Sequence, residues 1–167
     1  YISYKQELPD SILSNAKVID NKLAEITVCD PAVGSGAFLV GMMKEIVRCR
    51  SALTPYFNDP HERTPYHFKR HAIQSSLYGV DIDAGAIEIA KLRLWLSLVV
   101  DEENVTQIKP LPNLDYKVVI GNSLLSIEID AFNTHLFRQL ENEKNLLFDE
   151  TDMNKKAEHK RKIDALI

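Results

Sequence analysis

The chain has little of several features that define common protein classes. It contains two cysteines, Cys29 and Cys49, which we expect to be buried thiols rather than a disulfide. No apolar run reaches ~18 residues and no signal peptide is recognisable, so we expect no membrane span and a soluble, cytoplasmic protein. The net charge of -4 over 167 residues argues against a strong nucleic-acid-binding surface on this chain. The hydrophobic residues, 45% of the total, nevertheless suffice for the core of one domain.

A glycine-rich segment is the most informative feature that the chain does have. Residues 26–29 are apolar or β-prone, Asp30 follows them, and a Gly-Ser-Gly turn at 34–36 leads into a helix expected from Ala37 to about Arg50. A strand, a glycine turn and a helix in this order can bind a nucleotide-like ligand at the edge of a parallel α/β sheet. A phosphate-binding P-loop would need Gly-Lys-Ser/Thr after the turn, which is missing here. The turn therefore suits a positively charged ligand without phosphate, with an ordinary tight turn as the alternative.

A second segment repeats the pattern. Residues 77–80 form a short apolar strand, and Asp81 at its end is placed to accept both hydroxyls of a ribose. Asp83 is expected to cap the next helix, where its side chain would satisfy free backbone amides. That helix is apolar around much of its circumference, so we expect it to lie on the sheet and to be partly covered elsewhere as well. Trp95 is expected in the core rather than stacked on a cofactor.

A third segment carries the same signal more weakly. Residues 117–120 form a short apolar strand that turns out through Gly121 and Asn122. Because the carboxyl ends of parallel strands meet at one sheet edge, Asn122 is expected to lie in line with Asp30 and Asp81. Its side chain can accept a hydrogen bond from the exocyclic amine of an adenine. The alternative is a plain Gly-Asn turn, which this dipeptide favours by itself.

Together the three segments resemble class I S-adenosylmethionine (SAM)-dependent methyltransferases. More narrowly, they resemble the DNA adenine-N6 methyltransferases of the type IIG, Eco57I-like restriction-modification group. The matching motifs are Asp-Pro-Ala-Val-Gly-Ser-Gly-Ala-Phe at 30–38, Tyr-Gly-Val-Asp-Ile-Asp at 78–83 and Gly-Asn-Ser-Leu-Leu at 121–125. The resemblance implies an α/β, Rossmann-like fold with a doubly wound, mostly parallel sheet, of which about three βα units are present.

The resemblance also implies a set of residues that hold the cofactor SAM. Asp30 would face the ammonium group of the methionine moiety, Asp81 would accept the ribose hydroxyls, and Ile82 would pack on the adenine. Asn122 would accept from the adenine amine, and the backbone amide of Ser123 would donate to a ring nitrogen. Many relatives carry aspartate at the Asn122 position, whose charge makes a stronger acceptor. The expected cofactor-binding residues are Asp30, Pro31, Ala32, Val33, Gly34, Gly36, Phe38, Asp81, Ile82, Asn122, Ser123 and Leu124.

No catalytic residue is expected in this chain. The enzymes that this chain resembles polarise the target amine with an Asn/Asp-Pro-Pro-Tyr/Phe motif. This sequence lacks the motif, since no two of its prolines are adjacent. We therefore interpret the chain as a fragment that carries the cofactor-binding half. Residues 1–125 would be the SAM-binding part and residues 126–167 a charged helical insertion before the missing motif. Within the first part, residues 1–25 would be leading helices and residues 54–76 an inserted loop and helix.

The implied reaction is methyl transfer from SAM to adenine N6, with the target base flipped out of double-stranded DNA. DNA would be bound by regions outside this chain, such as a target-recognition domain. An endonuclease would be fused to the protein or would act as its partner. The protein would work in the cytoplasm of a bacterium or archaeon. Alternatives are an RNA or protein-glutamine N-methyltransferase and a non-catalytic scaffold of a DNA restriction complex. A nicotinamide-dependent oxidoreductase is disfavoured because Leu39 stands where its third glycine belongs.

Two other groups of residues suggest binding sites. His61, His67 and His71 invite a metal site, but no cysteine or clustered carboxylate accompanies them, so we expect exposed histidines and no metal. The basic cluster within residues 155–162 could contact a DNA phosphate, whereas its acidic neighbours favour a solvated helix face.

Overall fold

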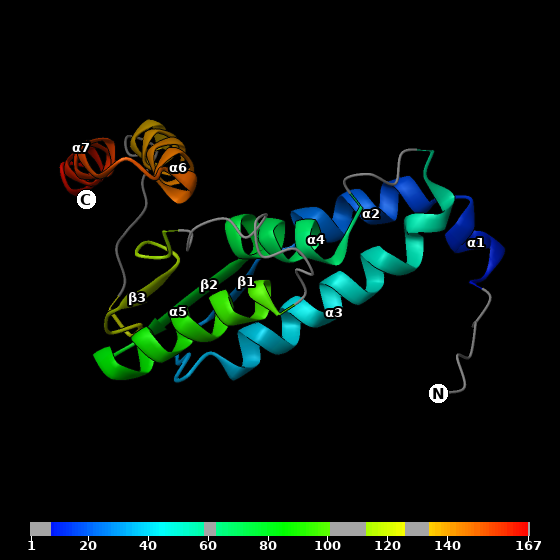
Figure 1. Ribbon diagram of the computed structural model, residues 1–167, viewed down its shortest axis with the longest axis horizontal. Coiled ribbons are helices and arrows are strands. Elements are labelled where there is room, and N and C mark those ends of the chain that lie inside the picture. Colours follow the sequence, from blue (N-terminus) through cyan, green and yellow to red (C-terminus); the bar gives the residue numbers. More distant parts are fainter. Residues whose placement is uncertain (1–7, 59–62, 101–112, 126–133, 167) are drawn as a thin grey trace.

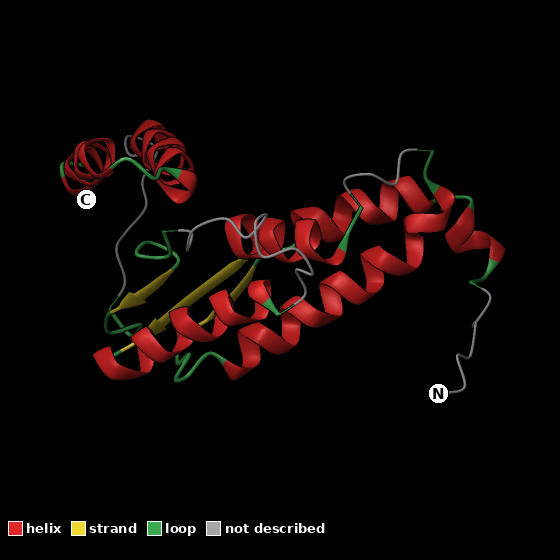
Figure 2. Ribbon diagram, in the orientation of Figure 1, coloured by secondary structure: helices red, strands yellow, loops and turns green. Residues whose placement is uncertain are grey.

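The computed structural model describes residues 8–58, 63–100, 113–125 and 134–166. Within these residues, the centre of the molecule is a parallel sheet of three strands in the order β1-β2-β3 (Figures 1 and 2). The strands are β1 (Val28–Asp30), β2 (Leu77–Asp81) and β3 (Val118–Ile120). A parallel sheet whose strands are connected through helices confirms the expected α/β, Rossmann-like class.

Helices cover one face of this sheet and lie at one of its ends. Helices α3 (Ala37–Leu53) and α5 (Ala84–Val99) run along the same face, as Figure 2 shows. None of the described helices is both long enough and apolar enough to cross a membrane. The remaining helical elements are α1 (Asp10–Leu13), α2 (Ala16–Glu25), η1 (Thr54–Tyr56), α4 (Pro65–His71), η2 (Ala72–Ser76), α6 (Thr134–Asp149) and α7 (Met153–Asp164).

The local signals of the sequence match these elements closely. β1 begins two residues later than expected, at Val28, because α2 ends only at Glu25 and Ile26 forms its C-cap. α3 continues three residues past Arg50, to a buried Leu53. The predicted cap of α5 is confirmed, since the Asp83 carboxylate accepts from the Ala86 amide at 2.9 Å.

The hydrophobic core lies between the sheet and helices α3 and α5. Its central side chains come from both layers and are almost fully buried: Leu39, Met43, Leu77, Ile87, Leu94 and Val118. The outer face of α5 is only partly covered. Ile89 and Leu92 are both 51% exposed and Leu96 is 46% exposed. This face is thus about half covered, and the apolar stripe centred on Ile87 and Leu94 is the one that seats the helix on the sheet.

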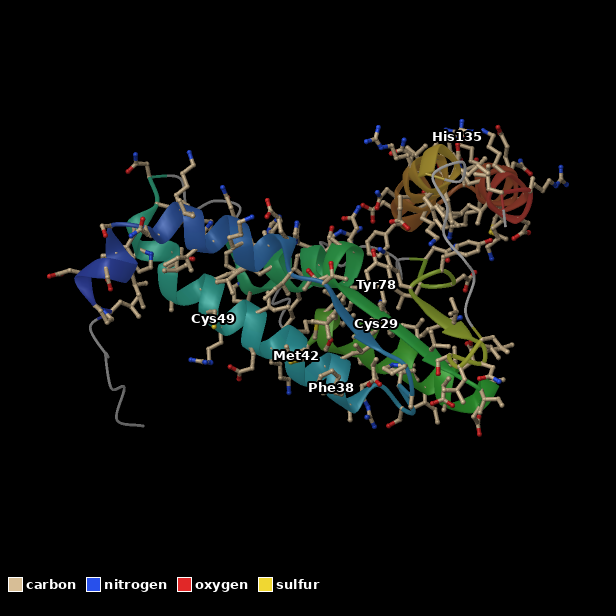
Figure 3. All side chains as sticks on the ribbon, turned by 180° about the vertical axis from the view of Figure 1, so that it is seen from behind. Cys29, Phe38, Met42, Cys49, Tyr78 and His135 are labelled. Carbon is tan, nitrogen blue, oxygen red and sulfur yellow. The ribbon has the colours of Figure 1, made fainter. Side chains whose placement is uncertain are left out.

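The face of the sheet away from helices α3 and α5 carries Cys29, whose exposure differs from the expectation. Cys29 is exposed and Cys49 is only half-buried, and both are free thiols. In β1, Cys29 points away from the helices because neighbouring strand residues alternate between faces. Its partner in the register is Tyr78, and Figure 3 labels both residues on the strands seen from behind. The expectation of buried thiols was therefore wrong for Cys29.

Helices α6 and α7 form a hairpin that docks on the same core through the end of α6. Phe148 is 2% exposed and belongs to the core cluster, and its carbonyl accepts from the Asn113 amide at 2.9 Å. In the basic segment of α7, Lys160 pairs with Asp115 at 2.5 Å and Lys162 pairs with Glu158 at 2.7 Å. The boundary predicted at residue 125 stays a prediction.

Candidate functional site

The three polar side chains singled out by the sequence lie at the carboxyl edge of the sheet. Asp30 is the last residue of β1, Asp81 is the last residue of β2, and Asn122 follows the end of β3 by two residues. The strands are neighbours and parallel, with Asp30 opposite Gly79 and Asp81 opposite Ile120. These side chains therefore share the edge at which open α/β sheets bind ligands.

The loop between β1 and α3 requires its glycines for two different reasons. Gly34 has φ +49° and Gly36 has φ +78°, a region that other residues adopt only with strain. At Gly36 space is also limiting, since an added Cβ would lie 3.0 Å from the Cβ of Ala90. At Gly34 an added Cβ would meet nothing within 4 Å. The glycine turn is thus pressed directly against helix α5 at Gly36.

The carboxylate of Asp81 holds this loop. One oxygen accepts from the Gly34 amide at 2.8 Å and the other from the Asp83 amide at 2.9 Å. Backbone hydrogen bonds, from Asp83 first and then from Gly34, hold the pKa of Asp81 below its usual value. The Val33 amide also donates to the Val80 carbonyl at 2.9 Å. Sequence reasoning assigned Asp81 to a ligand and missed its contact with the loop, because 47 residues separate the two partners.

Asp30 and Asn122 each shape the turn that follows them. The Asp30 carboxylate accepts from the Ala32 amide at 3.1 Å, and the Asn122 side-chain oxygen accepts from the Leu124 amide at 3.0 Å. Such Asx turns are typical of these residue types. A carbonyl or carboxylate oxygen carries two lone pairs, so both side chains retain capacity to accept from a ligand.

The apolar members of the predicted set divide into exposed and buried residues. Ile82 is 79% exposed, Leu124 is 89% exposed and Phe38, which Figure 3 labels at the start of α3, is 55% exposed. Val33 is only 4% exposed and packs beneath the loop against Gly79. The first three side chains are available to a ligand, whereas Val33 has only its backbone to offer. Pro31, Ala32 and Ser123 are exposed.

Comparison with known proteins identifies the family. A family model described as the MmeI DNA-methyltransferase domain matches residues 7–137. The chain belongs to this family. A protein of Methanocaldococcus jannaschii, provisionally named a type II restriction enzyme and methyltransferase, is 41% identical over 130 residues. The match covers 70% of this chain and 11% of that relative, so the chain spans about a tenth of the relative's length. No solved structure gives a significant match.

In this MmeI-type domain, a buried charge network lies apart from the sheet edge. Asp20 of α2 accepts from Arg50 of α3 at 3.0 Å and from Arg63 at 2.9 Å, and all three side chains are at most 10% exposed. The guanidinium of Arg50 lies 4.5 Å from the ring centre of Phe68, and that of Arg63 lies 3.6 Å from the ring of Phe57. The network ties α2 to α3 and to the start of α4. Nothing in the sequence pattern indicated it.

The same region contains two of the three histidines considered above as metal ligands, and both of them line a cleft of about 480 Å³. His67 is exposed, and its ring Nδ1 lies 2.7 Å from the Thr64 hydroxyl. His71 is half-buried, and burial followed by the charge of Arg50 lowers its pKa. His61 lies outside the described residues. Within the described part of the methyltransferase domain, no cluster of histidine, cysteine and carboxylate side chains is arranged to hold a metal ion.

Proposed function

We propose that the chain is the SAM-binding portion of a DNA adenine-N6 methyltransferase from a restriction-modification system. The observation that carries this proposal is the arrangement of Asp30, Asp81 and Asn122 at neighbouring carboxyl ends, beside a glycine loop that Asp81 holds. Membership of the MmeI DNA-methyltransferase family supports DNA methylation. The similarity to a protein named for both restriction and methylation supports the restriction-modification context.

The chemistry of the site fits SAM. The cofactor carries an ammonium group and a sulfonium, and the carboxylates of Asp30 and Asp81 supply the negative charge that such a ligand needs. Hydrogen bonds from two amides favour the ionised form of Asp81, which is the form that accepts from ribose hydroxyls. The exposed side chain of Ile82 offers an apolar surface for the adenine ring. When bound, SAM supplies an electrophilic methyl group.

The contribution of this chain to the reaction is placement. Asp30 would orient the methionine moiety, Asp81 the ribose, and Asn122 with the Ser123 amide the adenine of the cofactor. A fixed methyl donor lowers the entropic cost of an in-line transfer. The target adenine has to leave the DNA stack to reach that methyl group, and contacts to DNA and to the adenine N6 would come from other parts of the protein.

Calorimetry with SAM on the full-length protein tests the proposal. We expect saturable binding by the wild-type protein and binding weakened roughly ten- to a hundredfold by Asp81→Ala, which removes a charged hydrogen-bond acceptor. Incubation with labelled SAM and DNA, followed by nucleoside mass spectrometry, should give N6-methyladenine. The isolated chain should transfer no methyl group. Methylated RNA or methylated glutamine in place of adenine would favour the alternative substrates, and absence of SAM binding would refute the proposal.

A further inference from the structure

Three consecutive residues of the glycine loop are each held by the unit formed by β2 and α5. The Gly34 amide donates to Asp81 at the end of β2. Gly36 lies against Ala90 of α5, so closely that a Cβ would be 3.0 Å away. Between these two glycines, the Ser35 hydroxyl accepts from Nη1 of Arg93 at 3.0 Å. The loop therefore rests on one strand end and one helix face.

Arg93 is placed for this contact by the helical repeat. It follows Ala90 by three residues, and residues three apart share one face of a helix. Arg93 lies on the exposed surface of α5 and forms no ion pair within the part of the chain that the structure describes. Its hydrogen bond to Ser35 bridges 58 residues of sequence. Among the described contacts, it is the side-chain hydrogen bond from α5 to the loop, beside the packing of Ala90 on Gly36.

We infer that Arg93 is a positioning residue for the cofactor-binding loop and acts through Ser35. Gly34 and Gly36 flank Ser35, and glycine has the largest backbone freedom to lose when a loop is fixed. A tether at Ser35 removes part of that freedom before a ligand arrives. Pre-ordered loops bind more tightly because less entropy is lost on binding. This role for Arg93 in SAM binding rests on the proposed function, whereas its effect on the free loop does not.

Four variants of the full-length protein test the tether. Arg93→Gln and Ser35→Ala each remove the hydrogen bond, the double variant tests whether the two residues act together, and Arg93→Lys restores a donor. Arg48→Gln is the matched control, because Arg48 is an exposed arginine of α3 that pairs with Glu45. Hydrogen exchange of the loop amides measures the free loop, and calorimetry measures SAM binding.

We expect Arg93→Gln and Ser35→Ala each to raise loop exchange and to weaken SAM binding by roughly two- to tenfold, the range for one net hydrogen bond. The double variant should be no worse than either single variant, and Arg93→Lys should recover most of the loss. Arg48→Gln should change neither quantity, and thermal stability should stay constant in all five proteins.

The outcomes separate this inference from the proposed function. Unchanged loop exchange and unchanged SAM affinity in Arg93→Gln would overturn the tether while leaving SAM binding intact. Additive losses in the double variant would also overturn it, since the two side chains would then act independently. A wild-type protein that binds no SAM would refute the proposed function and the cofactor role of Arg93 together, even if faster exchange in Arg93→Gln still demonstrated the tether.

Discussion

Replacing Gly79 with alanine is predicted to displace the residues that support the glycine loop of the candidate site. Gly79 lies in the middle of β2, opposite Asp30 of β1 and Val118 of β3. An alanine Cβ at this position would lie 2.8 Å from Cγ2 of Val33 and 3.1 Å from Cδ1 of Leu39. Both neighbours are buried, and the contact with Val33 is the shorter one, so most of the strain falls on Val33, which supports the glycine loop.

The magnitude follows from two opposing effects. Overpacking a dense core by one methyl group costs about 1–3 kcal/mol. Alanine also restricts the unfolded chain more than glycine does, which returns about 0.5–1 kcal/mol. The net loss should therefore lie between about 0 and 2.5 kcal/mol. Because Val33 has to shift, SAM affinity should fall as well.

Gly41→Ala provides the matched control. Gly41 lies inside α3, and an added Cβ there would meet nothing within 4 Å. The same substitution should therefore stabilise the protein by about 0.5–1 kcal/mol through helix propensity. Hydrogen exchange at amides of β2 and α3 in the full-length protein reports both changes as local opening free energies. If Gly79→Ala and Gly41→Ala changed the opening free energy in the same direction, the predicted clash at Gly79 would be refuted.

Three further predictions concern the network, the loop and the hairpin. Asp20→Asn should cost about 3–5 kcal/mol in a denaturant titration, because it leaves buried guanidinium charges without their carboxylate. Burial raises the pKa of Asp20, but hydrogen bonds from its arginine partners outweigh this and hold the pKa below its usual value. The stabilising contribution of Asp20 should therefore be present at neutral pH and be lost as pH falls through that lowered pKa. Gly36→Ala should weaken SAM binding more than Gly34→Ala in calorimetry, because only at Gly36 does a clash add to the strained φ. Phe148→Ala should cost about 3–5 kcal/mol and release the α6–α7 hairpin to proteolysis, whereas an unchanged protease pattern would indicate that the hairpin docks without it.

The sequence predicted those parts of the fold that depend on local signals. The strand, turn and helix around Gly34–Gly36 could be predicted because apolar runs and glycines specify them within a few residues of each other. The cap at Asp83 could be predicted for the same reason. The buried pair of Asp20 and Arg50 joins residues 30 positions apart, and no periodic pattern encodes such a contact.

Exposure was the other quantity that local pattern could not predict. The apolar stripe of Ile89, Leu92 and Leu96 has the composition of a buried face, yet these side chains are about half exposed. Hydrophobicity shows that a residue can be buried, whereas burial depends on whether another element is present to cover it. The same reasoning applies to Cys29, which lies on the face of the sheet away from α3 and α5.

The position of Asp81 links the two halves of the candidate site. Its carboxylate accepts from the Gly34 amide and from the Asp83 amide, and in the proposed function it also accepts from the ribose. One side chain would then fix the loop that holds the methionine moiety and bind the nucleoside. The two amide contacts orient the carboxylate and favour its ionised form, which is the form that the proposed ribose contact needs. The loop itself favours an acidic residue at this strand end. The two amides point at different oxygens of Asp81, and an asparagine in the same position would turn its NH2 group toward one of these donors.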